Sequence, residues 1–137
     1  MTSIGLIFMA YDYVSNHYEF YGYKSNFCLI AGYGLDKKYH LSSVLENNLN
    51  KNGLKVKVIN ASVSGDTSAG GLNRIEWTIS EKNIDLILIG LGANDMLRGI
   101  SPNETEKNLE KTIKKILDKK IQIILAGMVA PDSHGKD

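Results

Sequence analysis

The chain has 137 residues and a formal net charge of +1, from 16 basic and 15 acidic residues, and 43% of its residues are hydrophobic. These values fit one globular domain and leave no room for a second. The charge balance argues against a broad nucleic-acid or polybasic membrane-binding surface. The single cysteine excludes an internal disulfide and a zinc cluster of several thiolates. No apolar run approaches the roughly 18 residues of a membrane span, so we expect no stable membrane insertion.

The N-terminal part of the chain follows neither a strand period nor a helix period. Five of the seven tyrosines lie in residues 11–23, either as an aromatic binding face or as part of an irregular segment. Residues 4–10 are apolar, but no basic residue precedes them and no clear small-residue cleavage site follows, so we expect no signal peptide. We predict an irregular or divergent segment over 1–25 and a domain over 26–137.

From residue 27 onward, short apolar runs alternate with helical patterns. The pattern predicts, in chain order, strand 27–31, helix 39–52, strand 54–59, helix 69–81, strand 84–91, a helix that starts at Ser101, and strand 121–129. Ser101 has the residue type of an N-cap, and a proline and a capping-box glutamate follow it. The run 84–91 is almost wholly apolar, which is typical of a strand covered on both faces. This alternation predicts a three-layer α/β/α fold with a parallel, flavodoxin-like sheet.

Apolar residues at helical spacing predict the buried face of each helix. They are Leu41, Val44, Leu45 and Leu49 in the first helix, Leu72, Ile75 and Ile79 in the second, and Leu109, Ile113, Ile116 and Leu117 in the third. With four strands and three crossovers, we also expect one exposed sheet edge or one uncovered helix-packing surface.

Ligands of such sheets bind beyond the carboxyl ends of the strands, so the loops after the strands are the place for chemistry. Two of these loops contain groups suited to stabilising an oxyanion. Gly65 lacks a side chain, so its N–H can approach a substrate closely, and Asn94 carries an amide donor just after a buried strand. Such preorganised donors are each worth roughly 3 to 4 kcal/mol in acyl transfer. The alternative is that Asn94-Asp95 forms only a turn and Ser64-Gly65-Asp66 only a helix cap.

Other kinds of site find little support in the sequence. Residues 31–35 have two glycines of a dinucleotide fingerprint but not the third, and a nucleotide-binding flavodoxin-like module would rest on fold analogy alone. No metal cluster is visible, and we interpret Asp66 and Asp95 as hydrogen-bond acceptors that brace their loops. We expect no cofactor.

Two motifs, SGDT-x-x-GGL-x-R at 64–74 and G-x-ND-x-LRG at 92–99, occur in the order, spacing and loops of a known family. From about Leu29 to its end, the chain resembles the SGNH (GDSL) hydrolases, especially the bacterial thioesterase I, lysophospholipase L1 and arylesterase group. The resemblance implies that Gly65 and Asn94 are oxyanion-hole residues. It also implies hydrolysis of small carboxylic esters or thioesters through an acyl-enzyme, without a cofactor.

The family's nucleophile is the serine of a Gly-Asp-Ser-Leu motif at the end of the first strand. Aligning that motif on Leu29 puts Cys28 at the nucleophile position, with Asn26 and Phe27 in place of the glycine and aspartate. A thiolate can attack an acyl carbonyl if a base activates it, and the alternative is a buried, inert cysteine. Ser25 is a second hydroxyl, but it is out of register with the motif.

The family's base is the histidine of an Asp-x-x-His motif that follows a fifth strand, so the resemblance implies that residues 26–137 are a partial, C-terminally incomplete SGNH hydrolase domain. Asp132 and His134 lie in the loop after the fourth strand at a different spacing, so the role is not carried onto them. His17, in the irregular segment, and His40, at a helix start, are also poor matches, and no base is identified. Two functions stay open: an ester or thioester hydrolase, and an inactive fragment or pseudoenzyme that at most binds acyl ligands.

Overall fold

The computed structural model describes residues 24–28, 36–80 and 83–127. The tyrosine-rich stretch 11–23, most of the predicted N-terminal segment and the loops at 31–35 and 130–137 lie outside these residues. The division after residue 25 stays a prediction.

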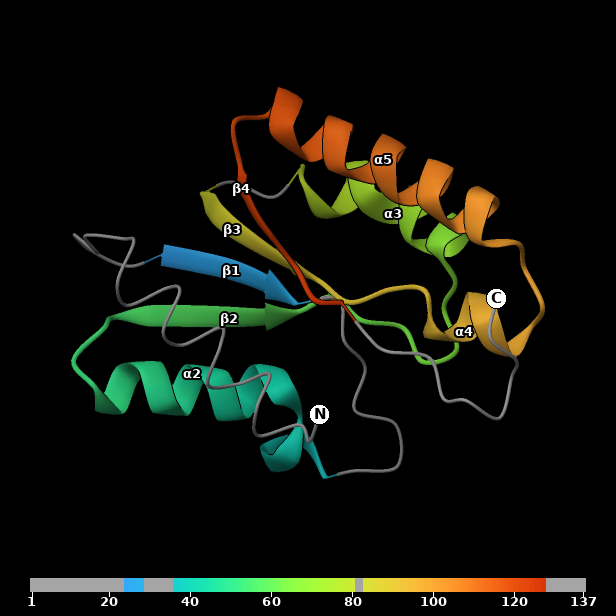
Figure 1. Ribbon diagram of the computed structural model, residues 1–137. Helices are drawn as coiled ribbons and strands as arrows, with labels where there is room; N and C mark the ends of the chain where they lie inside the picture. Colours follow the sequence, from blue (N-terminus) through green and yellow to red (C-terminus); the bar gives the residue numbers. More distant parts are fainter. Residues whose placement is uncertain (1–23, 29–35, 81–82, 128–137) are drawn as a thin grey trace.

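A four-stranded sheet forms the centre of the molecule (Figure 1). Its strands are β1 (Lys24–Cys28), β2 (Val56–Asn60), β3 (Ile84–Ile89) and β4 (Gln122–Leu125). They lie in the order β2-β1-β3-β4, and every neighbouring pair is parallel. This confirms the predicted α/β fold with a parallel sheet.

The bounds of the strands differ from the apolar runs of the sequence, because pairing with neighbouring strands also decides where a strand begins and ends. β1 begins at Lys24, three residues before the predicted strand 27–31, because its polar first half pairs with β2 and β3. β3 ends two residues before the predicted 91, and β4 covers residues 122–125 of the predicted 121–129, of which 128 and 129 lie outside the described residues. Ala126 N still donates to Ile89 O at 2.7 Å, so the contact between β3 and β4 extends one residue further.

The helices are α2 (Leu41–Lys51), α3 (Ser68–Thr78), α4 (Ala93–Leu97) and α5 (Pro102–Asp118), and a 3₁₀ turn, η1 (Lys37–Tyr39), precedes α2. The bounds of α2 and α3 differ from the predicted ranges by one to three residues. Ser101 caps α5 as predicted, accepting a hydrogen bond from Glu104 N at 3.3 Å, and Pro102 is the first helical residue.

The prediction that Asn94 lies in a loop after a strand is wrong, because it is part of the short helix α4. Gly92, with φ of +116°, redirects the chain after β3, and its carbonyl accepts from Met96 N at 3.0 Å. A helix of five residues is too short to be stable on its own, so its stability comes from tertiary contacts.

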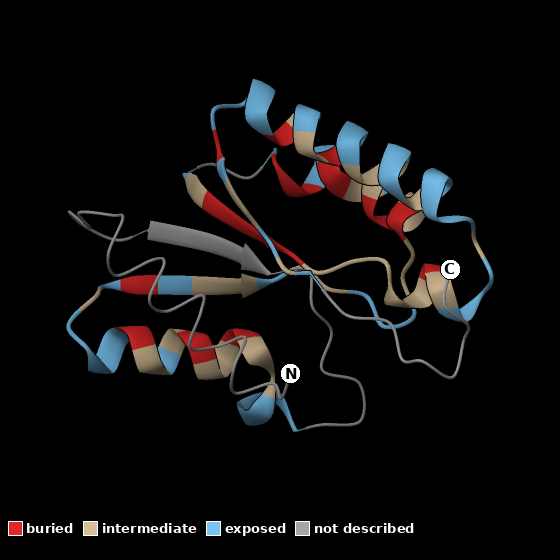
Figure 2. Ribbon diagram, viewed as in Figure 1, coloured by how far each residue is buried: buried red, intermediate tan, exposed pale blue. Residues whose placement is uncertain are grey.

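The last four residues of β3 are buried (Figure 2), and successive ones pack on opposite faces of the sheet. Leu86 and Leu88 pack in a cluster with Leu45 and Leu49 of α2. Ile87 and Ile89, on the other face, pack in a cluster with the buried isoleucines of α3 and α5. This confirms that helices cover both faces.

Most positions of the predicted helix stripes are confirmed, whereas Val44 and Leu72 are half-buried and belong to neither core cluster. Buried or packed against the core are Leu41, Leu45, Leu49, Ile75, Ile79, Leu109, Ile113 and Ile116. Leu117 is 56% exposed, so its predicted burial is wrong. The reason is that α5 contacts the core through a narrow stripe centred on Ile116, and Leu117 lies beside that stripe.

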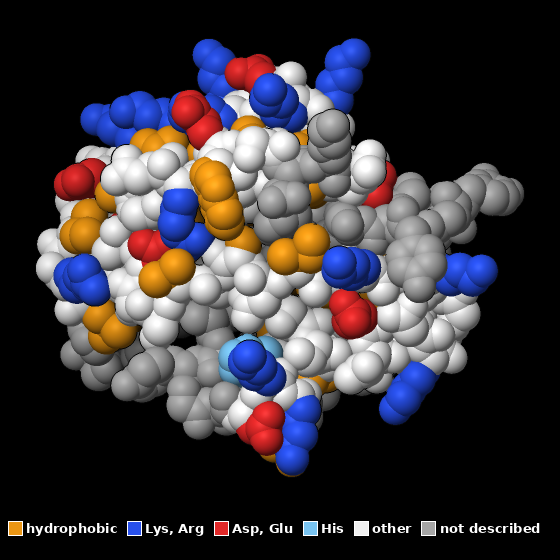
Figure 3. Space-filling view, turned by 180° about the vertical axis from the view of Figure 1, so that it is seen from behind, with side chains coloured by type: hydrophobic (Ala, Val, Ile, Leu, Met, Phe, Trp, Pro, Cys, Tyr) orange, Lys and Arg blue, Asp and Glu red, His pale blue; other side chains and the backbone are white. Residues whose placement is uncertain are grey.

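Several large apolar side chains remain on the surface, among them Trp77 of α3, which is 71% exposed, and Leu125 of the edge strand β4. Basic side chains gather over α5, with acidic ones among them (Figure 3). Among the described helices, none combines the length and apolar character that a membrane crossing needs.

Candidate active site

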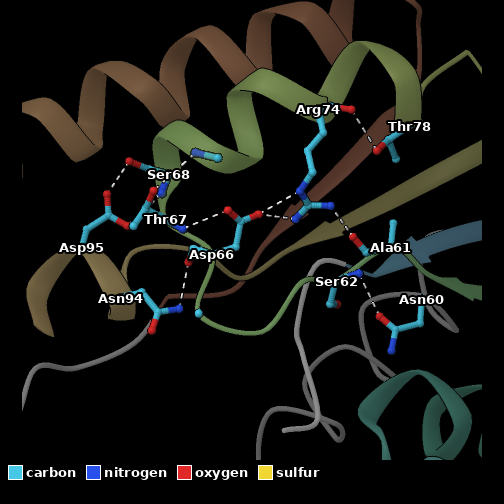
Figure 4. A network of polar contacts seen from close by, with 12 residues as sticks. Asn60, Ala61, Ser62, Asp66, Thr67, Ser68, Arg74, Thr78, Asn94 and Asp95 are labelled. Atoms are coloured by element: carbon cyan, nitrogen blue, oxygen red, sulfur yellow. Dashed lines mark hydrogen bonds and ion pairs between the residues drawn. The ribbon is translucent and has the colours of Figure 1, made fainter. Parts of the chain in front are cut away.

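The candidate site lies at the carboxyl ends of the strands, where the loop after β2 meets α4 (Figure 4). The chain runs from β1 to β2 on one side and returns to β3 on the other, so the strand order reverses between β1 and β3. Such a switch point is the usual ligand position in open parallel sheets. The loop with Gly65 and the helix with Asn94 therefore lie where a ligand is expected.

Gly65 occupies a tight turn. Asp66 N donates to Val63 O at 3.3 Å, and Gly65 has φ of +77°, whereas Ser64 is not among the residues with positive φ. This combination defines a type II turn with Gly65 in its third position. A Cβ on Gly65 would find ordinary space, with Arg98 Nη2 at 3.6 Å, so backbone conformation is what favours glycine here. The turn type sets the direction of the Gly65 N–H.

Asn94 reaches from α4 to this turn. Its Nδ2 donates to Asp66 O at 2.8 Å, one residue after Gly65. A primary amide carries two N–H groups, so one fixes the side chain while a second is left for a ligand. Within the described residues, Asp66 O is the only acceptor for this amide.

Asp95 connects α4 to the two neighbouring helices. The residue is 1% exposed, and its carboxylate accepts hydrogen bonds from Ser68 N at 2.8 Å, from Ser68 Oγ, and from Thr105 Oγ1 at 3.2 Å. Asn108 Nδ2 donates to the same Ser68 hydroxyl at 3.1 Å. These bonds join α4 to the N-terminus of α3, where a negative group is favoured, and to α5. The prediction that Asp95 braces its loop is confirmed.

Asp66 braces the other loop. Its carboxylate accepts from Thr67 N at 3.1 Å and from Nε of Arg74 at 2.8 Å, and it forms an ion pair with that guanidinium. Arg74 Nη1 also donates to Ala61 O at 2.5 Å, so the loop is tied to α3 at both ends. A Cβ on Gly70 would lie 1.8 Å from Asp66 Oδ1, which explains why glycine stands there. The prediction for Asp66 is confirmed as well.

Arg98, for which the sequence indicated no role, donates from Nη2 to Gly65 O at 2.8 Å. The spacing of Asn94 and Arg98 is that of neighbours on one helix face, but it carries this meaning only if residues 93–97 are helical.

Cys28 is the last residue of β1, and its backbone is in register with Asn60 and Leu88. It therefore lies at the same end of the sheet as the Gly65 turn. Ser25 pairs with Lys57 and Ile84 in the amino half of the strand, away from the loops.

His40 precedes α2, and its Nδ1 lies 3.4 Å from Nδ2 of Asn60, the residue in register with Cys28. The structure thus brings an imidazole to the site end of the sheet, at a position where the sequence indicated no role. His17, Asp132 and His134 lie outside the described residues.

The described residues contain no group of three or more His, Cys, Asp or Glu side chains that could hold a metal ion. A shallow pocket of about 450 Å³ lies between the C-terminal ends of α3 and α5, lined by Glu76, Ile79, Ser80, Lys115, Asp118 and Lys119. These helix ends precede β3 and β4, so the pocket is at the opposite end of the sheet from Gly65. A hydrogen bond and the charge of Lys115 lower the pKa of Glu76 there.

Residues 29–137 match the model of the GDSL-like lipase/acylhydrolase family. Esterase TesA of Pseudomonas aeruginosa is 37% identical over 105 residues, which are 77% of this chain and 52% of the relative. An arylesterase of Vibrio mimicus is 39% identical over 108 residues, which are 79% of this chain and 54% of the relative. The chain thus spans about half the length of these curated relatives.

The solved structure of AlinE4, an SGNH-hydrolase family esterase, superimposes with a TM-score of 0.80 at 38% identity, covering 86% of this chain and 66% of that one. Sequence and fold agree in the region that carries Gly65 and Asn94. The chain therefore belongs to the GDSL-like lipase/acylhydrolase family and has the fold of an SGNH hydrolase.

Proposed function

We propose that the chain hydrolyses carboxylic esters or thioesters through an acyl-enzyme, with Gly65 N–H and Asn94 Nδ2 as oxyanion donors. The observation that carries the proposal is the 2.8 Å bond from Asn94 Nδ2 to Asp66 O. It holds the Asn94 amide beside the turn that presents the Gly65 N–H. Two rigid donors at one end of the sheet suit the charge that develops on an acyl oxygen. The relatives named esterase and arylesterase favour small ester substrates.

In the proposed reaction, the Cys28 sulfur attacks the acyl carbonyl carbon, and the carbonyl oxygen becomes the oxyanion. Collapse of the tetrahedral intermediate breaks the bond to the leaving group, which departs with the thiol proton as an alcohol or thiol. Water then attacks the enzyme thioester, releases the acid and restores the thiol. His40 is the histidine that the described residues offer at this end of the sheet, so it is the group to test as the proton acceptor.

The alternative function is binding of acyl ligands without turnover. It is favoured by Asn26 and Phe27, which stand where the family has the glycine and aspartate before its nucleophile. In this case the oxyanion donors persist, but no acyl-enzyme forms.

The test is hydrolysis of p-nitrophenyl acetate by the full chain and by Cys28→Ala, Asn94→Ala and His40→Gln. We expect no turnover with Cys28→Ala, and a kcat about 10² to 10³ lower with Asn94→Ala at a similar KM, because the oxyanion forms only in the transition state. His40→Gln should lower kcat if the imidazole accepts the proton. Lys114→Met, an exposed change on α5, is the matched control.

Mass spectrometry of the reaction mixture should show an acetyl group on Cys28. A chain that neither turns over nor becomes acetylated would support the alternative, and full activity in Cys28→Ala would refute the assigned nucleophile.

A further inference from the structure

We propose that Arg98 is a positioning residue that fixes the Gly65 turn to α4 and thereby sets the spacing of the two oxyanion donors. This inference rests on the proposed function, because it concerns the same two donors. It starts from a pair of hydrogen bonds that bridge one face of α4 and the turn.

Two successive carbonyls of the turn accept hydrogen bonds from α4. Asn94 Nδ2 donates to Asp66 O and Arg98 Nη2 donates to Gly65 O, each at 2.8 Å. The two donors are four residues apart, so they lie above one another on the helix face. Together they attach the turn at two adjacent points, which prevents it from pivoting about either bond.

Asn94 alone does not attach the turn in this way. Its bond is to Asp66 O, which follows Gly65 in the chain, whereas the Gly65 N–H that would meet the oxyanion precedes the Gly65 carbonyl. The Arg98 bond holds the Gly65 carbonyl itself, which is nearer to that N–H by one residue. Without it, the Gly65 end of the turn can move while the Asn94 bond stays intact.

The base of the Arg98 side chain is itself fixed. Arg98 N donates to Asn94 O and Asp95 O at 3.1 Å each, which ends α4, and Gly99 follows with φ of +66°. The buried Asp95 carboxylate fixes the helix to α3. A rigid helix thus presents the guanidinium to the turn.

Arg98 is also not committed elsewhere. Arg74 is held by Asp66 and Ala61 O, whereas Arg98 has no carboxylate partner in the described residues. Its contact with the turn therefore does not compete with an ion pair. A charged donor to a carbonyl is stronger than a neutral one, which suits a contact exposed to water.

The first measurement needs no substrate. Hydrogen exchange of Asp66 N–H, which bonds Val63 O across the turn, is followed by NMR in the full chain and in Arg98→Met, Arg98→Gln and Arg98→Lys. We expect exchange about tenfold faster in Arg98→Met, as loss of one charge-assisted hydrogen bond predicts. Arg98→Gln, which keeps a donor but no charge, should restore part of the protection, and Lys114→Met should leave it unchanged.

The second measurement is p-nitrophenyl acetate hydrolysis by the same variants. Arg98→Met should lower kcat about tenfold while KM is unchanged, because only the transition state carries the oxyanion. Unchanged Asp66 exchange in Arg98→Met would overturn the positioning role whatever the activity. Faster exchange in a chain without turnover would instead refute the proposed hydrolysis and leave the attachment of the turn in place.

Discussion

At the scale of single residues, the two aspartates in the family motifs act as buried or half-buried acceptors that hold loops in place. Asp66 orders its own turn through Arg74, and Asp95 joins three helices through Ser68 and Thr105. The residues proposed to contact a ligand, Gly65 and Asn94, stand directly before them in the chain. Each motif thus combines a candidate donor with the residue that supports it.

Replacing Asp95 by asparagine tests this support. An asparagine keeps an oxygen for the Ser68 N–H, but its amide nitrogen then lies where the Ser68 and Thr105 hydroxyls now donate. The Ser68 hydroxyl, which already accepts from Asn108 Nδ2, would lose its acceptor, and the site would lose a charged acceptor. We expect a loss of roughly 1–3 kcal/mol in the free energy of unfolding, measured by urea denaturation. Asp118→Asn on the surface of α5 is the matched control and should change it by less than about 0.5 kcal/mol. Equal effects of the two changes would refute the supporting role.

Gly70→Ala tests the packing behind the turn. The new Cβ would lie 1.8 Å from Asp66 Oδ1, so the carboxylate has to leave Arg74. We expect about 3 kcal/mol of destabilisation, the sum of overpacking and the lost bonds. At Gly53, where φ is +86° and nothing lies within 4 Å, alanine adds only backbone strain of about 1–2 kcal/mol. Thermal unfolding of the two variants compares these costs.

At the scale of elements, α4 shows what a sequence pattern can and cannot predict. The longer helices carry apolar stripes and caps, such as Ser101 before α5, and their positions could be predicted. A helix of five residues is too short to show a periodic stripe, and tertiary bonds of Asp95 hold it in place. Gly65 and Asn94 could be chosen as candidates from their residue types and motifs. The contact between Arg98 and the Gly65 carbonyl could not be predicted, because it depends on residues 93–97 being helical.

The ion pair between Glu76 of α3 and Lys115 of α5 predicts a pH dependence. Lys115 lowers the pKa of Glu76, so the contribution of the pair to stability is complete above the ordinary glutamate pKa and is lost as pH falls through the lowered value. Glu76→Gln should therefore be less stable than the unchanged chain at neutral pH and equal to it in acid. Urea denaturation as a function of pH measures this, and high salt should reduce the difference, because both groups are exposed.

At the scale of the whole molecule, β3 is the strand on which both cores depend. Ile87 belongs to the cluster with α3 and α5, and Leu88 to the cluster with α2. The near-continuous apolar run of this strand made its two-sided burial predictable. The exact extent of β1 was less predictable, because pairing with neighbours on both sides positions its polar first half.

Ile87→Ala and Leu88→Ala should each lower the free energy of unfolding by about 2–5 kcal/mol, because both side chains are buried. Both should shift the midpoint of one cooperative transition, seen by far-ultraviolet circular dichroism during urea denaturation. Two separate transitions, each sensitive to one variant, would show that the two faces of the sheet unfold independently.

Trp77 is the chain's one tryptophan, and its side chain is 71% exposed on α3. Its indole is already surrounded by water in the folded state, so its emission should change little when the chain unfolds. The same exposure makes it accessible to a soluble quencher such as acrylamide under native conditions. Intrinsic fluorescence is therefore a poor monitor of folding for this molecule, but a sensitive reporter of anything that covers the outer surface of α3.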